Sequence, residues 1–209
     1  GELPLLPWAK ELRDKRVEKD EPYVACLPMS VPRVNPYPWK FAMSYTDKGL
    51  SHIYVLHETG DAGAHRVVYM DGRPHPKGLV PSWWGHSIGK WEGDTLVIDS
   101  VGFKDEKVWI DENANPHSDA LHVIERWSRP DYDHIHVDTL IEDPKFYTRP
   151  FTYSRTWVLG KPVVTSPIVG ASKPQHLADA VAALSVRLPA DAVAELEAPY
   201  IPHAVVGFK

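Results

Sequence analysis

The chain has 209 residues and a formal net charge of −5 at pH 7, from 23 Lys and Arg against 28 Asp and Glu. This balance argues against a nucleic-acid surface, and no apolar run approaches the roughly 18 residues that a membrane-spanning helix needs. A single cysteine, Cys26, excludes an internal disulfide and zinc-finger cysteine spacing. The 20 prolines predict rigid turns and few long helices.

Residues 1–49 are expected to pack on a larger core. Residues 8–19 are mostly charged, with two apolar residues four positions apart, which is typical of a short surface helix. Five prolines within residues 22–40 favour an extended segment. The sequence starts at Gly1 rather than Met, so we expect that any export signal is missing from it.

Residues 50–158 carry the pattern of an antiparallel β core. Six segments rich in β-branched and aromatic residues are predicted as strands: 52–58, 66–70, 95–101, 121–127, 134–141 and 151–158. The short connections show no helical pattern. We therefore predict a mainly β fold, an antiparallel meander rolled as a barrel or sandwich, with a lipocalin-like calyx as one form.

Residues 159–209 are predicted to form a helical tail of two helices. Residues 171–184 begin with a plausible capping box, Ser172 and Gln175, and a second short helix is expected near residues 190–197.

Several strings in the first part of the chain resemble a large family of bacterial proteins without an established activity. They are CLPMSVPR (26–33), DGRPHP (71–76), GHSIGKWEGDTLVIDSVGF (85–103), PHSDALHVIERW (116–127) and IEDP (141–144). The resemblance covers residues 4–158. It implies an antiparallel β domain, an export signal and a periplasmic or secreted location, but no reaction.

The tail, residues 161–208, resembles the C-terminal end of an aldo-keto reductase. In that family the segment matching residues 170–173 and His176 helps to hold the 2′-phosphate and adenine of NADP. Asp179-Ala180 replaces a common Glu-Asn pair, and nothing in residues 1–160 resembles the reductase barrel or its catalytic residues. We therefore expect the tail to pack or to form a homo-oligomer rather than to use NADP.

Three histidines lie in turns beside predicted strands: His75, His86 and His117. Turns at the rim of a β scaffold commonly carry catalytic groups, and the ordinary imidazole pKa near 6.5 suits an acid or a base. We predict that His86 and His117 act with Glu58 and Arg73 in proton transfer. If all three histidines converge, they also form a candidate site for zinc, copper or iron.

Aromatic residues surround His86 in the sequence. Trp83, Trp84 and Trp91, together with Phe103, are candidates for binding a flat apolar substrate. The alternative is that they are ordinary core residues.

Other polar residues favour structural roles. A carboxylate within an apolar strand needs an arginine or histidine partner unless it has a function, and for Asp99 and Glu125 a structural ion pair is favoured. The available arginines are Arg66, Arg73 and Arg126. His134 and His136 are expected on the solvent side of their strand. Residues 92–94 (Glu-Gly-Asp) predict a hairpin turn.

These observations favour an exported enzyme of lyase, hydrolase or isomerase type. Its substrate would be a small apolar or aromatic molecule in a Trp-lined pocket, with histidine and glutamate as acid and base, with or without a divalent metal. The first alternative is a binding module that holds an apolar ligand without catalysis. The second is NADP-dependent oxidoreduction through the tail.

Overall fold

The computed structural model describes residues 2–34, 37–58, 65–105, 108–158, 189 and 191–192. The chain divides into two units, residues 1–159 and 160–209, and every described strand belongs to the first. The predicted helices at 171–184 and 190–197 lie outside the described residues, except that Asp191 and Ala192 are helical.

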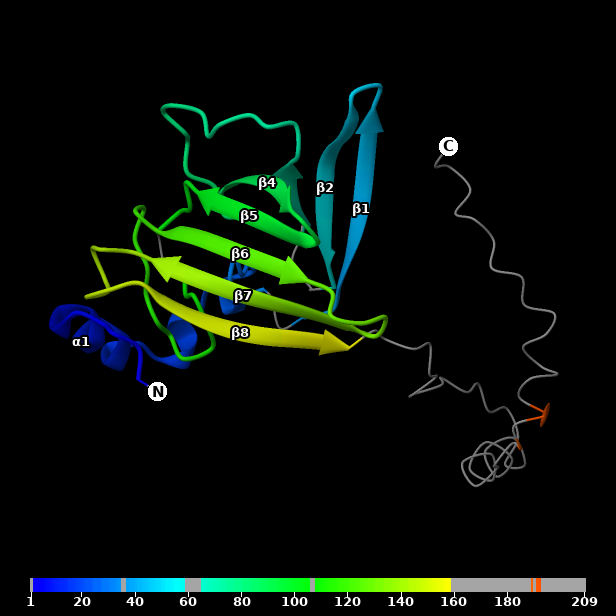
Figure 1. The fold of residues 1–209 in the computed structure, drawn as a ribbon. Helices are drawn as coiled ribbons and strands as arrows, with labels where there is room; N and C mark the ends of the chain where they lie inside the picture. The colour runs from blue at the N-terminus through cyan, green and yellow to red at the C-terminus, as the bar shows by residue number, and fades with distance from the viewer. Residues whose placement is uncertain are drawn as a thin grey trace, which may run out of the picture. The chain divides into compact units, whose positions relative to one another are not determined.

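Eight strands form one sheet whose spatial order follows the order of the chain, which confirms the predicted mainly β meander (Figure 1). The strands are β1 (Trp39–Thr46), β2 (Gly49–His57), β3 (His65–Tyr69), β4 (His86–Glu92), β5 (Thr95–Val101), β6 (His122–Ser128), β7 (His134–Glu142) and β8 (Phe151–Val158). All six predicted strands are present, and β1 and β4 are additional. The hairpin predicted at residues 92–94 connects β4 to β5, with Gly93 at φ +59°.

Every pair of neighbouring strands is antiparallel except β3 and β4, which are parallel. This parallel pair has only two register partners, Val68 with Ser87 and Tyr69 with Ile88. A parallel pair requires a crossover connection. Residues 70–85 make that crossover, and they contain several of the predicted site residues.

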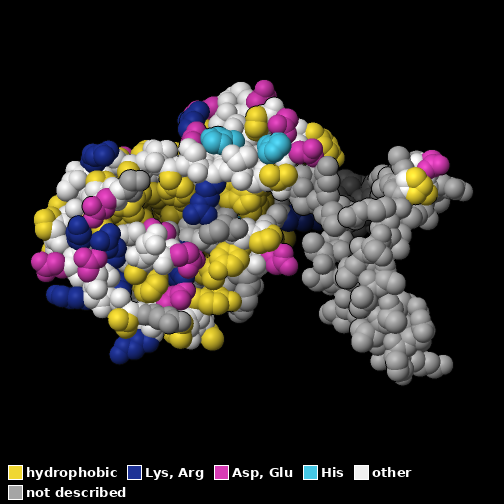
Figure 2. Space-filling view, turned by 90° about the horizontal axis from the view of Figure 1, so that it is seen from below, with side chains coloured by type: hydrophobic (Ala, Val, Ile, Leu, Met, Phe, Trp, Pro, Cys, Tyr) yellow, Lys and Arg dark blue, Asp and Glu magenta, His cyan; other side chains and the backbone are white. Residues whose placement is uncertain are grey.

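The sheet is strongly curled, so that its two edge strands approach each other across its inner face (Figure 1). The Trp39 ring on β1 lies with its centroid 6.0 Å from that of Trp157 on β8. Both rings also contact Trp127 on β6, at 4.9 and 5.6 Å. Figure 2 shows hydrophobic side chains gathered along a hollow on the side of the molecule seen from below.

The N-terminal residues form short helices, as the sequence predicts for part of residues 8–19. α1 (Pro7–Lys15) begins with proline, whose missing N–H costs nothing in the first helical turn. Two 3-10 helices follow, η1 (Glu18–Asp20) and η2 (Pro22–Ala25). Within the described part of the chain, no helix has the length and apolar character to cross a membrane.

A buried polar cluster lies within the inner face of the sheet. The Arg66 guanidinium on β3 donates hydrogen bonds to Ser87 Oγ on β4 at 2.9 Å and to Ser100 Oγ on β5 at 2.6 Å. It also pairs with Glu125 on β6. The prediction of an arginine partner for Glu125 is confirmed.

Candidate functional site

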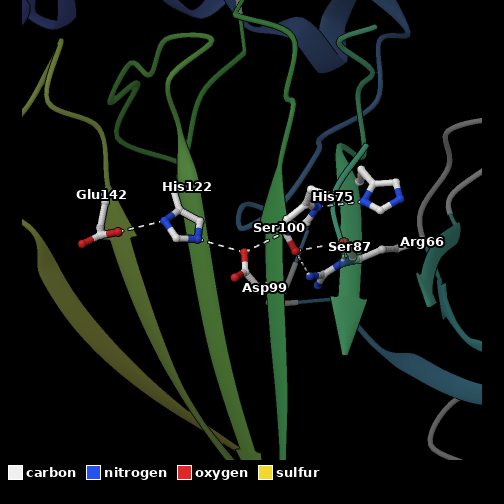
Figure 3. A network of polar contacts seen from close by, with 8 residues as sticks. Arg66, His75, Ser87, Asp99, Ser100, His122 and Glu142 are labelled. Atoms are coloured by element: carbon white, nitrogen blue, oxygen red, sulfur yellow. Dashed lines mark hydrogen bonds and ion pairs between the residues drawn. The ribbon is translucent and has the colours of Figure 1, made fainter. Parts of the chain in front are cut away.

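The opposite, outer face of the sheet carries a continuous chain of polar contacts, the histidine–carboxylate network (Figure 3). His86 Nδ1 and His75 Nδ1 are 2.8 Å apart, and His75 Nε2 lies 3.2 Å from Asp99 Oδ1. The same oxygen of Asp99 lies 2.9 Å from His122 Nε2. His122 Nδ1 in turn lies 2.8 Å from Glu142 Oε2. Five side chains from four strands and one loop are therefore linked.

Strand alternation explains why three of these side chains share a face. Asp99 lies between two buried residues of β5, Ile98 and Ser100, and therefore points away from the inner face. His122 is paired in register with Glu142. Because Asp99 is paired with Ile124, two positions along β6 from His122, it is the diagonal neighbour of this histidine.

The crossover loop contributes His75, and Tyr69 holds the loop in place. The Arg73 guanidinium lies 4.2 Å from the centroid of the Tyr69 ring, a cation–π contact. On β4, His86 stacks on the same tyrosine, with centroids 4.9 Å apart and an interplanar angle of 17°. Asp71 accepts hydrogen bonds from Arg73, which lower the Asp71 pKa to about 2. The loop is thus attached to the sheet beside His86.

Gly85 sets the entry into β4 immediately before His86. Its φ of +63° lies in the left-handed region that favours glycine. A Cβ atom there would lie 2.7 Å from the Val101 carbonyl oxygen and 2.8 Å from Phe103 Cε1. Only glycine therefore permits this close approach of the backbone to β5.

The hydrogen-bond pattern indicates which nitrogens carry protons. The ionised Asp99 carboxylate only accepts, so both histidines that contact it donate from Nε2. A neutral His75 then accepts at Nδ1, and His86 must donate from its own Nδ1. Among the described residues, no hydrogen bond engages Nε2 of His86. This nitrogen is left as a lone-pair acceptor.

The surroundings of His86 favour its neutral form. Burial lowers the pKa of His86 below the ordinary value, a proton on His75 would lower it further, and the charge of Arg73 lowers it too. Near pH 7 the imidazole is therefore unprotonated at Nε2. That is the state that a general base requires.

His122 has a different environment, because carboxylates face both of its ring nitrogens. The side chains of His122, Asp99 and Glu142 are 30%, 38% and 37% exposed, so solvent reaches this end of the network. The network thus runs from His86, whose imidazole is partly buried, to His122, which lies between two carboxylates.

The predicted convergence of three imidazoles is wrong for His117. Its side chain is buried, with Nδ1 2.9 Å from the Ser118 carbonyl oxygen and its ring against Phe103. Asp143 holds the turn inward by accepting from the N–H and Oγ of Ser118. Burial lowers the pKa of His117. Only His75 and His86 of the predicted trio are in contact.

The described residues contain no group of three or more His, Cys, Asp or Glu side chains arranged to hold a metal ion. In the His75–His86 pair, the two Nδ1 atoms face each other at 2.8 Å and share a hydrogen bond. A metal bound between them would have to break this contact.

The remaining predicted site residues lie outside the network. Glu58 is exposed just after β2. Trp83 lies beneath the Lys104 ammonium, Trp84 stacks on His57, and Trp91 is 53% exposed. Phe103 is fully buried in the core. The aromatic ring that stacks on His86 belongs instead to Tyr69.

The sequence patterns do not identify Tyr69, His122 or Glu142 as site residues. They predict an arginine or a histidine as the partner of Asp99, and Asp99 contacts two histidines, His75 and His122. The alternation of apolar and polar residues within residues 121–127 is the one pattern that could have indicated His122, because it places this side chain on the outer face of the sheet. Its pairing with Asp99 depends on register, which the alternation does not give.

Comparison with known families identifies one segment. Residues 150–201 match the family model described as the aldo/keto reductase family, in agreement with the resemblance of the tail. The match includes β8 and none of the network residues. No solved structure matches the chain. The resemblance of residues 4–158 to exported bacterial proteins stays a prediction.

Proposed function

We propose that the chain is an enzyme that transfers protons to and from a small organic substrate at the histidine–carboxylate network. One observation carries the proposal: Asp99 Oδ1 contacts both His75 and His122, and His75 contacts Nδ1 of His86. This arrangement leaves Nε2 of His86 as a base held by a second imidazole, which is itself held by a carboxylate. A base oriented by further polar groups is a recurrent catalytic arrangement.

In the proposed mechanism, His86 Nε2 removes a proton from a C–H or O–H group of the substrate. The imidazolium that forms donates from Nδ1 to His75, and the Asp99 carboxylate on the far side of His75 stabilises the positive charge. Return of the same proton to another substrate atom completes an isomerisation. Its delivery to a departing oxygen completes an elimination, and removal of a water proton begins a hydrolysis.

The groups around His86 support a flat substrate that carries negative charge. The Tyr69 ring stacks on His86 and the Arg73 guanidinium lies over the Tyr69 ring, so an aromatic group and a positive charge lie beside the proposed base. Arg73 is 43% exposed and its charge is shared with Asp71, so we assign it to attraction of the substrate rather than to proton transfer. A periplasmic or secreted location is proposed from the family resemblance alone.

The proposal is tested by turnover of a panel of aryl esters, β-hydroxy acids and enolisable ketones by the full chain. His86→Gln is expected to lower kcat/KM by about 10²- to 10⁴-fold, the range attributed to a general base. His134→Gln is the matched control, because His134 is also on the outer face but bonds only to Asp131 among the described residues. Its kcat/KM is expected to be unchanged.

Three results would overturn the proposal. The first is turnover that survives His86→Gln. The second is the absence of turnover for every compound in the panel. The third is binding of a panel compound without conversion, which would instead support the binding-module alternative.

A second candidate is NADP-dependent oxidoreduction, which the match of residues 150–201 favours. The resemblance implies that Lys173 and His176 would contact the 2′-phosphate and adenine. Titration of the full chain with NADPH tests this by quenching of tryptophan fluorescence. Saturable quenching that Lys173→Glu removes would support the candidate, and no quenching at millimolar NADPH would eliminate it.

A further inference from the structure

A cavity of about 410 Å³ lies between the N-terminal helices and the loop that carries Trp109. We call it the α1 cavity. Its lining residues come from α1, the segment through η1 and η2, and that loop: Leu12, Lys15, Arg16, Lys19, Asp20, Glu21, Ala25, Leu27 and Trp109. The volume falls within the roughly 300–1,000 Å³ of small-molecule sites. None of these residues belongs to the histidine–carboxylate network.

Arg16 is a partly buried cation that forms no direct ion pair among the described residues, although the nearby charge of Asp20 acts to raise its pKa. Its Nη1 donates to the Ala114 carbonyl oxygen at 2.8 Å, and its guanidinium lies 5.8 Å from the centroid of the Trp109 ring. A carbonyl group satisfies a donor but does not neutralise a charge. Burial accordingly lowers the pKa of Arg16. An anion in the cavity would compensate this charge.

The acidic residues of the cavity already have partners. Glu21 pairs with Arg33, a buried side chain that also contacts Glu112 at 3.1 Å. Asp20 Oδ2 accepts from the Val17 N–H at 3.1 Å. These carboxylates are therefore directed at groups of the protein.

The lysines of the cavity add positive charge. Lys15 lies 3.9 Å from Glu11 in an exposed pair, which is a weak interaction. Lys19 has no ion-pair partner among the described residues. Three cations, Lys15, Arg16 and Lys19, thus line the cavity together with two carboxylates, Asp20 and Glu21, of which Glu21 pairs with Arg33.

One side of the cavity is apolar. Leu12, Ala25 and Leu27 supply aliphatic surface, and Trp109 also lines the cavity, with Arg16 and Arg33 over its ring. Leu12 is 37% exposed, although it is an aliphatic residue of the helix that borders the cavity. An apolar group in the cavity would remove this surface from water, which is favourable in proportion to its area.

We propose that the α1 cavity binds a small amphipathic anion, a carboxylate attached to a short aliphatic or aromatic body. The carboxylate would accept from Arg16, with Lys15 and Lys19 nearby, and the body would lie against Leu12, Leu27 and Trp109. A charge-assisted, bidentate contact with guanidinium gives such an acid an advantage over an alcohol or an amine of the same length.

The experiment is calorimetric titration of the full chain with octanoate, octanamide and octylammonium. Octanoate is expected to bind with one site per chain, octanamide more weakly, and octylammonium not at all. Arg16→Gln should weaken octanoate binding by about 10- to 100-fold, the loss that corresponds to a hydrogen bond with a charged group. Arg13→Gln is the matched control, because it removes the same charge from α1 at a residue outside the cavity lining.

Lys19→Glu provides a second variant at an exposed position, should Arg16→Gln impair folding. It is expected to weaken octanoate binding, and added salt should weaken it further. The proposal fails if octylammonium binds as well as octanoate, if neither variant lowers the affinity for octanoate, or if octanoate does not saturate a single site. His86→Gln should leave octanoate binding unchanged, so failure here is distinguishable from failure of the proton-transfer proposal.

Discussion

Arg66 on β3 and Glu125 on β6 form an ion pair through the inner face of the sheet, although β4 and β5 lie between their strands. Their side chains are 2% and 0% exposed. The other guanidinium donors are bonded to Ser87 and Ser100, one on each intervening strand. A single arginine therefore connects four adjacent strands.

Loss of one partner of this pair should be strongly destabilising. Glu125→Ala leaves the Arg66 charge buried without its carboxylate, which typically costs about 3–5 kcal/mol in the free energy of unfolding. Urea denaturation followed by tryptophan fluorescence measures the change. The double variant Arg66→Met with Glu125→Leu should recover much of this loss, because neither charge then remains buried.

The exposed pair between Arg126 and Glu92 supplies the control for this measurement. Arg126→Gln should change the free energy of unfolding little, since exposed ion pairs contribute little to stability. Equal destabilisation by Glu125→Ala and Arg126→Gln would contradict the special role of the buried pair.

Gly85→Ala tests the close approach that precedes His86. The left-handed conformation costs an alanine about 1–2 kcal/mol, and the added Cβ would also lie 2.7 Å from the Val101 carbonyl oxygen. Gly78→Ala is the matched control, because Gly78 has φ +72° but no heavy atom within 4 Å of the position that a Cβ would take. Thermal unfolding should show a larger loss for Gly85→Ala, and equal losses would argue against the steric constraint.

Because His117 is buried, we expect the free energy of unfolding to decrease as the pH falls below neutral. Burial lowers its pKa in the folded state, while the unfolded chain keeps a value near 6.5. Below that pH the unfolded state binds more protons than the folded state, so the free energy of unfolding decreases as the pH falls. The contribution of one group approaches about 1.4 kcal/mol per pH unit.

This dependence is measured by urea denaturation between pH 7 and pH 5. His117→Gln removes the titrating group and should flatten the slope in that range. The control Arg126→Gln changes an exposed side chain that carries no imidazole and should leave the slope as it is. An unchanged slope in His117→Gln would contradict the assignment.

If His86 is the general base, its pKa determines where kcat/KM declines on the acid side (the acid limb) of the pH–rate profile. The pKa of His86 lies below the ordinary value of about 6.5. Nε2 therefore loses its proton at a lower pH than an ordinary histidine does, as the pH rises through this pKa. kcat/KM should therefore be level near pH 7 and should decline only when the pH falls through this lowered value. Arg73→Gln removes a positive charge near His86 and should shift the limb upward in pH.

The strands that the sequence predicted are those whose side chains alternate clearly. In residues 134–141, Val137 and Ile141 are buried, while His136 and Asp138 bond to each other on the outer face, as expected. β1 was missed because prolines precede it, and β4 because Gly89 and Lys90 interrupt its apolar pattern. Pairing with strands on either side stabilises β4, and that contribution is not local.

The candidate site was predicted only in part for a similar reason. Two of the three histidines expected to converge, His75 and His86, are in contact, because His75 lies in the crossover and His86 is the first residue of β4, directly after it. The link from Asp99 to His122 depends on the register of two strands that are separated by a long connection. His117 was misplaced because the bond between Ser118 and Asp143, which turns it inward, joins segments far apart in the sequence.

β3 and β4 pair over only two residues, and we call this parallel pairing the joint of the sheet. The sheet is expected to open first between these two strands. Few backbone bonds hold β1–β3 to β4–β8, so amide hydrogens at the joint should exchange with deuterium before those in the middle of the larger portion. The Arg66 side chain bridges the same joint from inside. Its removal should therefore accelerate deuterium exchange at the joint, while the shared hydrophobic core still holds β1–β3 to the rest of the sheet.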